Sequence, residues 1–456
     1  MKMTRKEFLT TAAIAAIGAT SNACAGLSAT RPGRPNFVIV LCDDLGYGDL
    51  SCYGNPIIDT PRLDRLASEG LRLTDCYAAA PVCSPSRAGM LTGRNPYRCN
   101  IPDWIPPGSP IHLQRNEITV AGLLRDAGYR SCHSGKWHCS GTMDGSQPTP
   151  GDHGFGHWFS TQNNAHPSHR NPDNFVRNGV PAGPLEGYSS TLIVDEAIRF
   201  LDTTRGDPFL LFVWFHSPHE PIATAPEFQD RCAREPDAAK RIYYGNVTQM
   251  DFEVGRLMDA LDARGLRENT FVMFTSDNGP ETLNRYKGAE LSHGSPGPLR
   301  GMKLHLHEGG IRVPGILRWP GHIGAKGTSG EPLNGADVLP TLCAMAGVDV
   351  PDDRPIDGAD FSPLLRGQAV RRGRPLYWRY DRALSAAKIA MRQGDWKILA
   401  DGSLGAVELY NLREDLGENR NLADAEPKRV AQMTDALRSI HQEITRESEA
   451  LGGVPS

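Results

Sequence analysis

The sequence predicts an α/β fold followed by a small α+β domain. Three long apolar runs indicate buried strands, and they stand at residues 36–42 (NFVIVLC), 209–216 (FLLFVWFH) and 270–279 (TFVMFTSDNG). Between them lie stretches with apolar residues at the spacing of a helix, an alternation that is typical of α/β proteins. Near the C-terminus the pattern changes to short strand-like runs, which indicate an antiparallel sheet.

Length and composition limit the possible classes of protein. The chain has 456 residues, more than one ordinary hydrophobic core organises, so we expect one large and one smaller domain. Hydrophobic residues make up 39% and charged residues 22%, as in an ordinary globular protein. The formal net charge of -4 disfavours general nucleic-acid binding, while a local basic pocket for an anionic substrate stays open. Beyond the N-terminus, no run approaches the ~18 apolar residues of a membrane span.

Residues 1–30 are predicted to be an export signal peptide. A basic start is followed by an apolar run at 8–19 and then by small residues. Arg5 and Lys6 in TRKEFL resemble the basic pair of a relaxed twin-arginine signal, and Cys24 is a candidate lipid-acceptor cysteine. The alternative is an N-terminal apolar helix that is retained as an anchor, although its length is marginal. We therefore expect a periplasmic or extracellular location.

The cysteines do not form a compact framework. When Cys24 and Cys83 are set aside from the ten cysteines, the others show no regular spacing. A chain of this length does not need disulfides to stabilise its core, so we expect at most one or two bridges. No spacing typical of a zinc site occurs.

Carboxylates follow two of the predicted buried strands. Asp43 and Asp44 come directly after the first apolar run, and Asp277 and Asn278 close the third. Either pair alone is more often a turn or a helix cap. In open α/β sheets, however, ligands bind at the carboxyl ends of the strands, and paired oxygens suit a hard divalent cation.

Cys83 lies in PVCSPSRAGMLTGR at 81–94, after a predicted helix at 60–70 and a predicted strand at 71–76. A lone cysteine beside a proline is usually a small buried hydrophobic residue. If Cys83 opens a helix, the free N–H groups and the dipole there favour an anion. Arg87, one turn later, would add a guanidinium at the same point.

A predicted helix at 119–127 and a strand near 129–134 lead to Lys136 and His138 in GKWH. On an extended segment, residues two apart face the same side, so both side chains are expected to point into one site. A surface loop is the alternative for so short a motif.

Residues 141–189 are rich in Gly, Pro, Asn and His and show no period. This composition indicates either a disordered insert or a binding surface carried on loops. The histidines have no spacing that fixes a metal site, so we predict instead that His153 and His166 hydrogen-bond to a polar sugar. Trp104 in IPDWIPPG is a candidate stacking platform for a sugar, with an ordinary packed tryptophan as the alternative.

The second half adds the remaining motifs. The second apolar run ends in HSPHEP, where His219 is a candidate site residue and His216 a structural one. Lys303 precedes the EGG that begins at Glu308. A large domain at 35–350 carries all these motifs. Helices are predicted here at 190–203, 240–262 and 335–347.

A linker rich in Pro and Asp is predicted at 351–370, and a small C-terminal domain at 371–456. Strands are expected near PLYWRY, AKIAMRQ, DWKILA and VELYNL. A terminal helix at 427–450 would pack on the antiparallel sheet that these strands form.

Together the motifs resemble those of the type I, formylglycine-dependent sulfatases. The C-x-P-S-R element followed by LTGR carries most of the resemblance, and the DD pair, GKWH, H-x-P-H, DNG and the lysine before EGGIRVP support it. The resemblance spans about residues 35–425 and is greatest to bacterial N-acetylgalactosamine-6-sulfatase-like and arylsulfatase-like enzymes. Cys139 stands where the family usually has Leu, and His305 and His307 are not part of the pattern.

The resemblance implies an alkaline-phosphatase-like fold, with a large mixed sheet between helices and the small C-terminal domain. It implies one calcium ion, bound by Asp43, Asp44, Asp277 and Asn278 together with the modified Cys83. A formylglycine-generating maturation enzyme would be a partner, because it converts Cys83 into formylglycine.

The roles of the site residues also come from the resemblance. The hydrated aldehyde offers one hydroxyl to the sulfur, and Arg87 and Lys136 stabilise that hydrate. Lys136, Lys303 and His219 bind the substrate, and His219 protonates the departing alcohol. His138 takes a proton from the second hydroxyl, so that the aldehyde is regenerated as sulfate leaves.

The implied function is hydrolysis of sulfate monoesters, with a sulfated carbohydrate or an aryl sulfate as substrate. The export signal and the resemblance favour an extracellular glycan, with a 6-O-sulfated galactose-type sugar as the candidate. Two alternatives stay open: a phosphonate monoester hydrolase or phosphodiesterase of the same superfamily, and an inactive glycan-binding protein. Nothing in the sequence indicates the oligomeric state.

Overall fold

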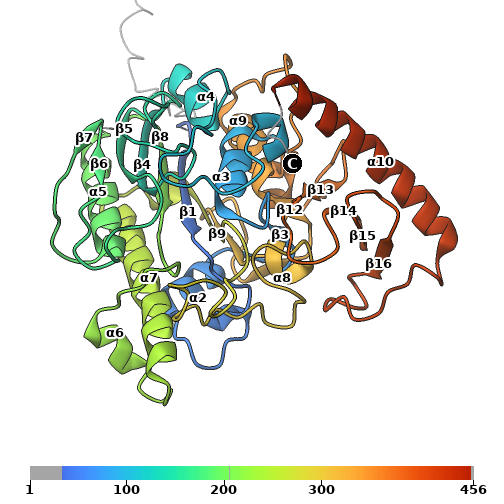
Figure 1. Ribbon diagram of the computed structural model, residues 1–456. Coiled ribbons are helices and arrows are strands. Elements are labelled where there is room, and N and C mark those ends of the chain that lie inside the picture. Colours follow the sequence, from blue (N-terminus) through green and yellow to red (C-terminus); the bar gives the residue numbers. More distant parts are fainter. Residues whose placement is uncertain (1–32, 205, 453–456) are drawn as a thin grey trace, which may run out of the picture. The chain divides into compact units, whose positions relative to one another are not determined.

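The structure is a computed structural model that describes residues 33–204 and 206–452 (Figure 1). The predicted export signal at 1–30, with Cys24, lies outside the described residues. The described residues from Arg34 onward form one compact unit. The predicted boundaries stay predictions: 35–350, 351–370 and 371–456.

A ten-stranded mixed sheet lies at the centre, as predicted. Its strand β1 (Asn36–Cys42) lies between β8 (Phe209–Trp214) and β9 (Thr270–Ser276), and both pairings are parallel. The three apolar runs of the sequence are thus neighbours. The other strands are β2 (Leu71–Leu73), β4 (Arg130–Lys136), β5 (His157–Thr161), β6 (Val176–Arg177), β7 (Val180–Pro181), β10 (Gly315–Arg318) and β11 (Gly327–Ser329). The strand order is β11, β2, β10, β9, β1, β8, β4, β5, β6, β7.

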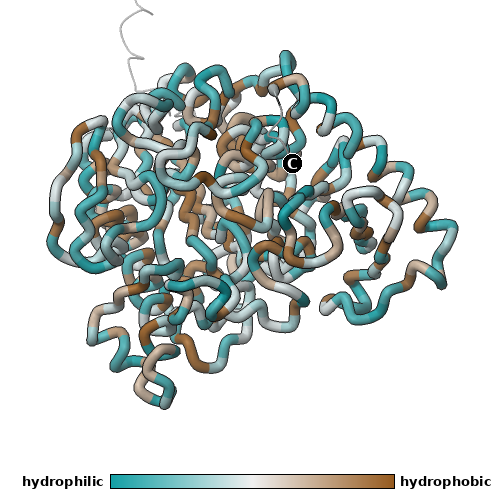
Figure 2. The backbone as a smooth tube through the Cα atoms, viewed as in Figure 1, coloured by the Kyte–Doolittle hydropathy of each residue, from teal (hydrophilic) through white to brown (hydrophobic). Residues whose placement is uncertain are grey.

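Both faces of β1 are buried, which explains its uninterrupted apolar sequence. Phe37, Ile39 and Leu41 face one hydrophobic core, and Val38 and Val40 face the other. Successive side chains of a strand point to opposite faces, so a strand that is covered on both sides is apolar throughout. Figure 2 shows apolar stretches gathered along the inner strands.

Helices cover both faces of this sheet (Figure 1). The first face packs against α3 (Cys83–Thr92), α4 (Val120–Asp126) and α9 (Val338–Ala346). The second face packs against α2 (Pro61–Ser68), α5 (Ser189–Thr203) and α7 (Ala238–Ala263). These helices lie where the sequence predicts them. Two shorter helices are α6 (Pro226–Arg231) and α8 (Glu308–Ile311).

The ends of the helices follow from the local sequence. The side chain of Asp237 caps α7 by accepting from the N–H groups of Ala239 and Lys240. Helix α3 starts at Cys83 without a side-chain cap and ends before Gly93, which has a left-handed φ of 69°. The first N–H groups of α3 therefore lack a capping side chain beside Cys83.

The predicted C-terminal sheet is present. Strands β13 (Leu376–Arg379), β14 (Ile389–Gln393), β15 (Trp396–Ala400) and β16 (Val407–Asn411) pair in that order, and each pairing is antiparallel. Helix α10 (Pro427–Ala450) packs on it through Met433, Leu437 and Ile444. Most of the other residues of α10 are hydrophilic (Figure 2).

One local prediction needs correction, and one open alternative is decided. The single strand expected at 71–76 is interrupted at Asp75, whose side chain is drawn into ion pairs. It forms β2 and a separate β3 (Cys76–Tyr77), which pairs with β12 (Leu333–Asn334). The stretch 141–189 is ordered, because β5, β6 and β7 extend the large sheet at one edge.

The described residues contain no disulfide. Every cysteine among them is a free thiol, and all but Cys52 are buried. The hydrophobic core stabilises a chain of this size without bridges. No helix in the described part of the chain is long and apolar enough to cross a membrane.

Candidate active site

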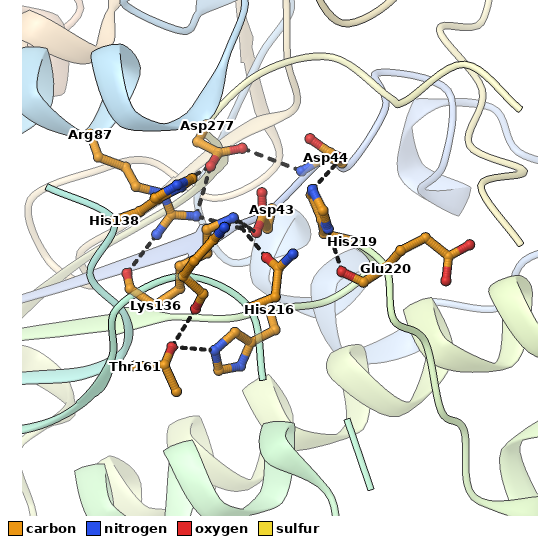
Figure 3. A network of polar contacts seen from close by, with 12 residues as sticks. Asp43, Asp44, Arg87, Lys136, His138, Thr161, His216, His219, Glu220 and Asp277 are labelled. Carbon is orange, nitrogen blue, oxygen red and sulfur yellow. Dashed lines mark hydrogen bonds and ion pairs between the residues drawn. The ribbon is translucent and has the colours of Figure 1, made fainter. Parts of the chain in front are cut away.

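The polar residues of the predicted site meet at the carboxyl ends of the parallel strands. Asp43 follows β1, Asp277 follows β9, and Lys136 ends β4. Cys42 of β1 lies opposite Ser276 of β9, so the two carboxylates that follow are neighbours. Figure 3 shows these side chains pointing toward one another.

Asp43 is buried among cations. The Nζ of Lys136 donates to its Oδ2, and Nη2 of Arg87 lies 3.8 Å from the same oxygen. Burial alone would raise the pKa of Asp43, but the nearby positive charges, Lys136 foremost, outweigh burial and hold that pKa well below its usual range. Lys136 also donates to Oδ1 of Asn164 at 3.0 Å. Asp43 is therefore ionised.

Arg87 holds Asp277 in place. Its Nε and Nη2 donate to Oδ2 of Asp277 at 2.9 and 2.7 Å, and its Nη1 donates to the carbonyl oxygen of Lys136 at 2.7 Å. The guanidinium also lies over the ring of Trp214, 5.1 Å from its centroid. Burial, followed by the charge of Asp43, raises the pKa of Asp277 to about 7. Arg87 thus ties helix α3 to two strand ends.

Asp44 is the centre of a second group of contacts. Nδ2 of Asn278 donates to its Oδ1 at 2.7 Å, and Nζ of Lys303 donates to its Oδ2 at 2.8 Å. Nε2 of His219 lies 3.5 Å from Oδ2. Lys303 also lies 3.6 Å from Oε2 of Glu281. Burial raises the pKa of Asp44 to about 6. Burial opposes the charge on Lys303, but Asp44 and the other anions outweigh it and keep the pKa of Lys303 well above its usual value.

The backbone is strained at three site positions. Asp44, His138 and Leu304 have φ angles of 62°, 53° and 68°, in the left-handed region that costs non-glycine residues about 1–3 kcal/mol each. Leu304 directly follows Lys303. Such conformations persist where the surrounding structure holds them, and they are frequent at functional sites.

Cys83 lies at the uncapped N-terminus of α3 and is buried. Its Sγ and one carboxylate oxygen each of Asp43 and Asp277 lie within 4.8 Å of one another. Burial raises the pKa of the thiol to about 11. At neutral pH the thiol therefore stays protonated, and an unmodified Cys83 is a poor nucleophile.

The carboxylates fit a divalent cation. Two buried oxygens, Oδ1 of Asp43 and Oδ1 of Asn278, have no hydrogen-bond partner among the described residues. A second set of possible ligand atoms, from Asp43, Asp44 and His219, also lies within 4.8 Å. Carboxylate and amide oxygens are the ligands that calcium prefers. The unpartnered oxygens are acceptors that a hard cation would satisfy.

His138 has a defined tautomer. Its Nε2 donates to the carbonyl oxygen of Ile105 at 3.1 Å, which leaves the buried Nδ1 as an acceptor without a partner. Burial, followed by the charge of Lys136, holds the pKa of His138 well below its usual value. A neutral imidazole with a free acceptor nitrogen is suited to take up a proton.

His219 and His216 lie in the segment after β8 (Figure 3). Nδ1 of His219 donates to the carbonyl oxygen of Glu220 at 2.5 Å. Burial, followed by the charge of Lys303, lowers the pKa of His219 to about 3. Nε2 of His216 lies 2.8 Å from Oγ1 of Thr161, and His216 does not line the pocket described next.

The site opens onto a pocket of about 430 Å³. Cys83, His138, His219 and Lys303 lie in its wall. This volume is in the range that accommodates a small organic ligand. The other polar and aromatic residues of the wall are Trp104, Asn163, Asn164, Glu281, Arg285, Tyr286 and Tyr380.

Two predicted sugar ligands do not reach this pocket. His153 is buried and stacks on Trp137 with ring centroids 5.7 Å apart. His153 does not reach the pocket because its ring packs within the core. His166 is exposed, and its Nδ1 lies 3.8 Å from a carboxylate oxygen of Asp173.

Other residues of the wall were missed in the sequence. Asn163 and Asn164 stand in the same loop as His166, and the NN doublet is the available signal. Glu281 lies four residues after Asp277 and binds Arg285 at 2.6 Å. Tyr380 comes from the C-terminal sheet region, and no local pattern indicates its position.

Two protein-family models match this chain. The family model described as Sulfatase matches residues 35–348. The model described as N-sulphoglucosamine sulphohydrolase, C-terminal, matches residues 302–448.

Individual proteins are similar over most of their length. Arylsulfatase A of Homo sapiens is 35% identical over 467 residues, which cover 91% of this chain and 88% of that protein. N-acetylgalactosamine-6-sulfatase of Rattus norvegicus is 34% identical over 400 residues, covering 80% and 71%. The crystal structure of Ps i-CgsB in complex with k-i-k-neocarrahexaose has a TM-score of 0.81 at 27% identity, covering 90% and 93%. The PsFucS1 sulfatase from Pseudoalteromonas sp. has a TM-score of 0.76 at 25% identity, covering 91% of each chain.

Proposed function

The chain belongs to the sulfatase family and is a sulfuric ester hydrolase, and we propose that it cleaves a sulfated carbohydrate with a formylglycine made from Cys83. The position of Cys83 carries this proposal. It starts α3, lies beside Asp43 and Asp277, and is the one cysteine in the wall of the pocket among the described residues.

Two groups would complete the site. Calcium, held by Asp43, Asp44, Asp277 and Asn278 beside position 83, would draw charge from the sulfate oxygens, and the aldehyde installed by a maturation enzyme would supply the attacking oxygen. The unpartnered oxygens of Asp43 and Asn278 support the cation. The protonated state of the Cys83 thiol supports the need for the aldehyde.

Lys136 and Lys303 are assigned to bind the sulfate. Both ammonium groups are buried; Lys136 pairs with Asp43, and Lys303 pairs with Asp44 and Glu281. An anion that enters the pocket therefore meets two fixed positive charges where little water screens them. Arg87 lies one turn along α3 from Cys83, and we assign it, with Lys136, to stabilise the nucleophile at position 83.

His138 and His219 are assigned to the two proton transfers. The free Nδ1 of His138 accepts a proton from the group at position 83 when the enzyme is regenerated. His219 donates a proton to the departing sugar oxygen. Its low pKa in the free protein results from burial and from Lys303. A bound sulfate opposes the charge of Lys303, so His219 is expected to gain its proton together with the substrate.

A sugar is the proposed substrate for three reasons. The pocket wall combines aromatic rings with asparagine side chains. One relative is an N-acetylgalactosamine-6-sulfatase, and one similar structure holds an oligosaccharide. A 6-O-sulfated galactose-type sugar is the first candidate. With residues 1–30 as an export signal, we propose a periplasmic or extracellular location.

Mass spectrometry of the peptide spanning residues 81–94 from active enzyme tests the nucleophile. We expect an aldehyde in place of the thiol, and fully active enzyme with unmodified Cys83 would contradict the mechanism. Sulfate release from sulfated sugars and from an aryl sulfate, measured beside hydrolysis of a phosphonate monoester, tests the substrate class. Faster phosphonate hydrolysis would favour the phosphonate alternative.

A further inference from the structure

We propose that Trp104 and Arg382 form a second sugar-binding subsite beside the active-site pocket, which holds the sugar next to the sulfated one. The enzyme would then act on oligosaccharides in preference to monosaccharides. This inference rests on the proposed function, because it takes the substrate to be a sulfated carbohydrate.

Trp104 stands between two cavities. It lines the pocket of about 430 Å³ that contains Cys83. It also lines a second pocket of about 650 Å³, whose wall includes Asp103 and Arg382. The side chain is 43% exposed. A ligand that extends from the first pocket into the second therefore passes over the indole.

The loop that carries Trp104 is tied to the reacting centre. The N–H of Ile105 donates to Oγ of Ser84, the residue after Cys83, at 3.0 Å. The carbonyl oxygen of Ile105 accepts from Nε2 of His138 at 3.1 Å. The position of the indole relative to Cys83 is thus set by two hydrogen bonds of its neighbour.

The same loop is braced from the C-terminal sheet region. Asp103 accepts from the backbone N–H of Trp104 at 2.8 Å. It also accepts from the hydroxyl of Tyr380 at 2.8 Å and from Nη1 of Arg382 at 3.0 Å. One carboxylate therefore holds both members of the proposed subsite.

Exposed apolar side chains concentrate around the pocket that contains Cys83. Trp104 and Tyr286 both line the first pocket, and Leu283 is in the same loop as Tyr286. Leu384 is also exposed, and its N–H donates to the carbonyl oxygen of Leu304 in the pocket wall. These residues are four of the seven large apolar side chains that are exposed in the described residues. Clustered exposure of this kind marks a binding surface.

The second pocket is polar enough to favour a sugar over an apolar leaving group. Its wall includes Arg379, Asp381, Thr445 and Ser448. The side chain of Arg382 is 77% exposed, so part of its guanidinium can reach sugar hydroxyls. A pyranose presents an apolar face and a hydroxyl-bearing rim, which matches an indole flanked by hydrogen-bonding side chains.

Substitution of Trp104 tests the subsite. We compare kcat/KM for a 6-O-sulfated galactose-type monosaccharide and for the matching tetrasaccharide. For Trp104→Ala we expect kcat/KM for the tetrasaccharide to fall by about 10- to 100-fold, mostly through a higher KM, because one aromatic contact with the substrate is lost. The loss of kcat/KM for the monosaccharide should be at least fivefold smaller. Trp104→Phe should recover part of the loss. Arg382→Gln should lower kcat/KM only for the tetrasaccharide, and by less than Trp104→Ala does.

Val180→Ala is the control, because Val180 is exposed on β7 and lines neither pocket. It should leave both substrates unaffected. Equal losses of Trp104→Ala on both substrates, or no loss on the tetrasaccharide, would overturn the subsite.

A binding measurement separates the subsite from the proposed function. Isothermal titration calorimetry follows binding of the desulfated tetrasaccharide to the wild-type enzyme and to Trp104→Ala. Binding that depends on Trp104 supports the subsite even if no sulfate is released from any substrate, a result that would overturn only the proposed function. Absence of binding to the wild-type enzyme would overturn the subsite.

Discussion

The active site and the junction with the C-terminal sheet both bury opposite charges, but they differ in how these charges are satisfied. At the active site, Asp43 and Asn278 each keep one buried oxygen without a hydrogen-bond partner in the described part of the chain, and Cys83, beside them, opens onto a pocket. At the junction the charges are paired with one another, and none of them lines that pocket. The residues of this junction cluster are Asp75, Tyr77, Glu308, Arg312, Arg392, Lys397 and Glu418.

The contacts of the junction cluster are close. Nζ of Lys397 lies 2.8 Å from Oε1 of Glu308 and 2.9 Å from Oε1 of Glu418. Asp75 pairs with Arg312 at 2.8 Å and with Arg392 at 2.6 Å. This cluster therefore joins α8, which follows the loop of Lys303, to β14 and β15.

Buried charge is therefore not by itself a sign of catalysis. Buried ion pairs are strongly destabilising to break whether or not they serve a reaction. What distinguishes the active site is the combination of unpartnered acceptor atoms, strained backbone and access from outside.

Removing the reactive group should give the largest effect. We expect Cys83→Ala to lower hydrolysis of an aryl sulfate by at least about 10³-fold, because the nucleophile is lost. The circular dichroism spectrum and melting temperature should stay close to those of the wild type. Cys343→Ala, which changes another buried thiol of the core, should keep activity. Substantial activity of Cys83→Ala would remove the distinction between the two clusters.

Breaking the junction cluster should act on stability. In Lys397→Met, Glu308 and Glu418 lose their shared cation, and we expect a loss of about 3–5 kcal/mol in the free energy of unfolding, measured in urea. Arg438→Met removes an exposed ion pair with Asp435 and should cost less than about 1 kcal/mol. Equal effects of both variants would show that the junction cluster stabilises nothing.

Calcium should stabilise only through the active site. At a hundredfold excess over its Kd, calcium added to chelator-treated protein should stabilise it by about 2.7 kcal/mol, read as a rise in melting temperature. Lys397→Met should keep this rise, since among the described residues the groups of possible metal ligands lie at the active site and not in the junction cluster. An undiminished rise in Asn278→Ala would argue against Asn278 as a ligand.

The pH dependence of stability should have one sign at Glu308 of the junction cluster and the opposite sign at Asp44 and Asp277 of the active site. Burial opposes ionisation of Glu308, but Lys397 and neighbouring arginines outweigh it and lower the pKa to about 2 from 4.5. A carboxylate with a depressed pKa stabilises the folded protein above about pH 4.5. This stabilisation is lost as the pH falls toward 2, by at most about 1.4 kcal/mol per pH unit. Burial instead raises the pKa values of Asp44 and Asp277 to about 6 and 7, so the metal-free protein gains stability from them as the pH falls from 7 toward 4.

Urea unfolding at several pH values, with chelator present, checks these signs. Glu308→Gln should lose stability less steeply than the wild type between pH 4.5 and 3. The same slope in both proteins would contradict the assignment of Glu308.

Much of the fold and of the charged site could be predicted from the sequence, for one physical reason. A strand buried on both faces must be apolar, so polar residues directly after it stand out, and Asp43 and Asp277 were identified in this way. The C-terminal sheet and α10 also follow from local periodicity.

The surroundings of the pocket depend on contacts that have no local signal. His153 was selected for the chemistry of imidazole, yet its ring packs against Trp137. Asn164 reaches Lys136 from the next loop, and Tyr380 reaches Asp103 across 277 positions of the chain. Only the three-dimensional arrangement brings such residues together.

The burial of Cys83 limits the time during which this side chain is accessible in the newly made chain. Under the proposed mechanism, a maturation enzyme has to modify this side chain before α3 packs and buries it. The site cannot close before β9 exists, and β9 ends at Ser276, about 190 residues after Cys83. At roughly 5–20 residues per second of synthesis this leaves on the order of 10 to 40 s. Under the same proposed mechanism, the fraction of molecules that become active depends on whether the modification precedes the completion of the central sheet.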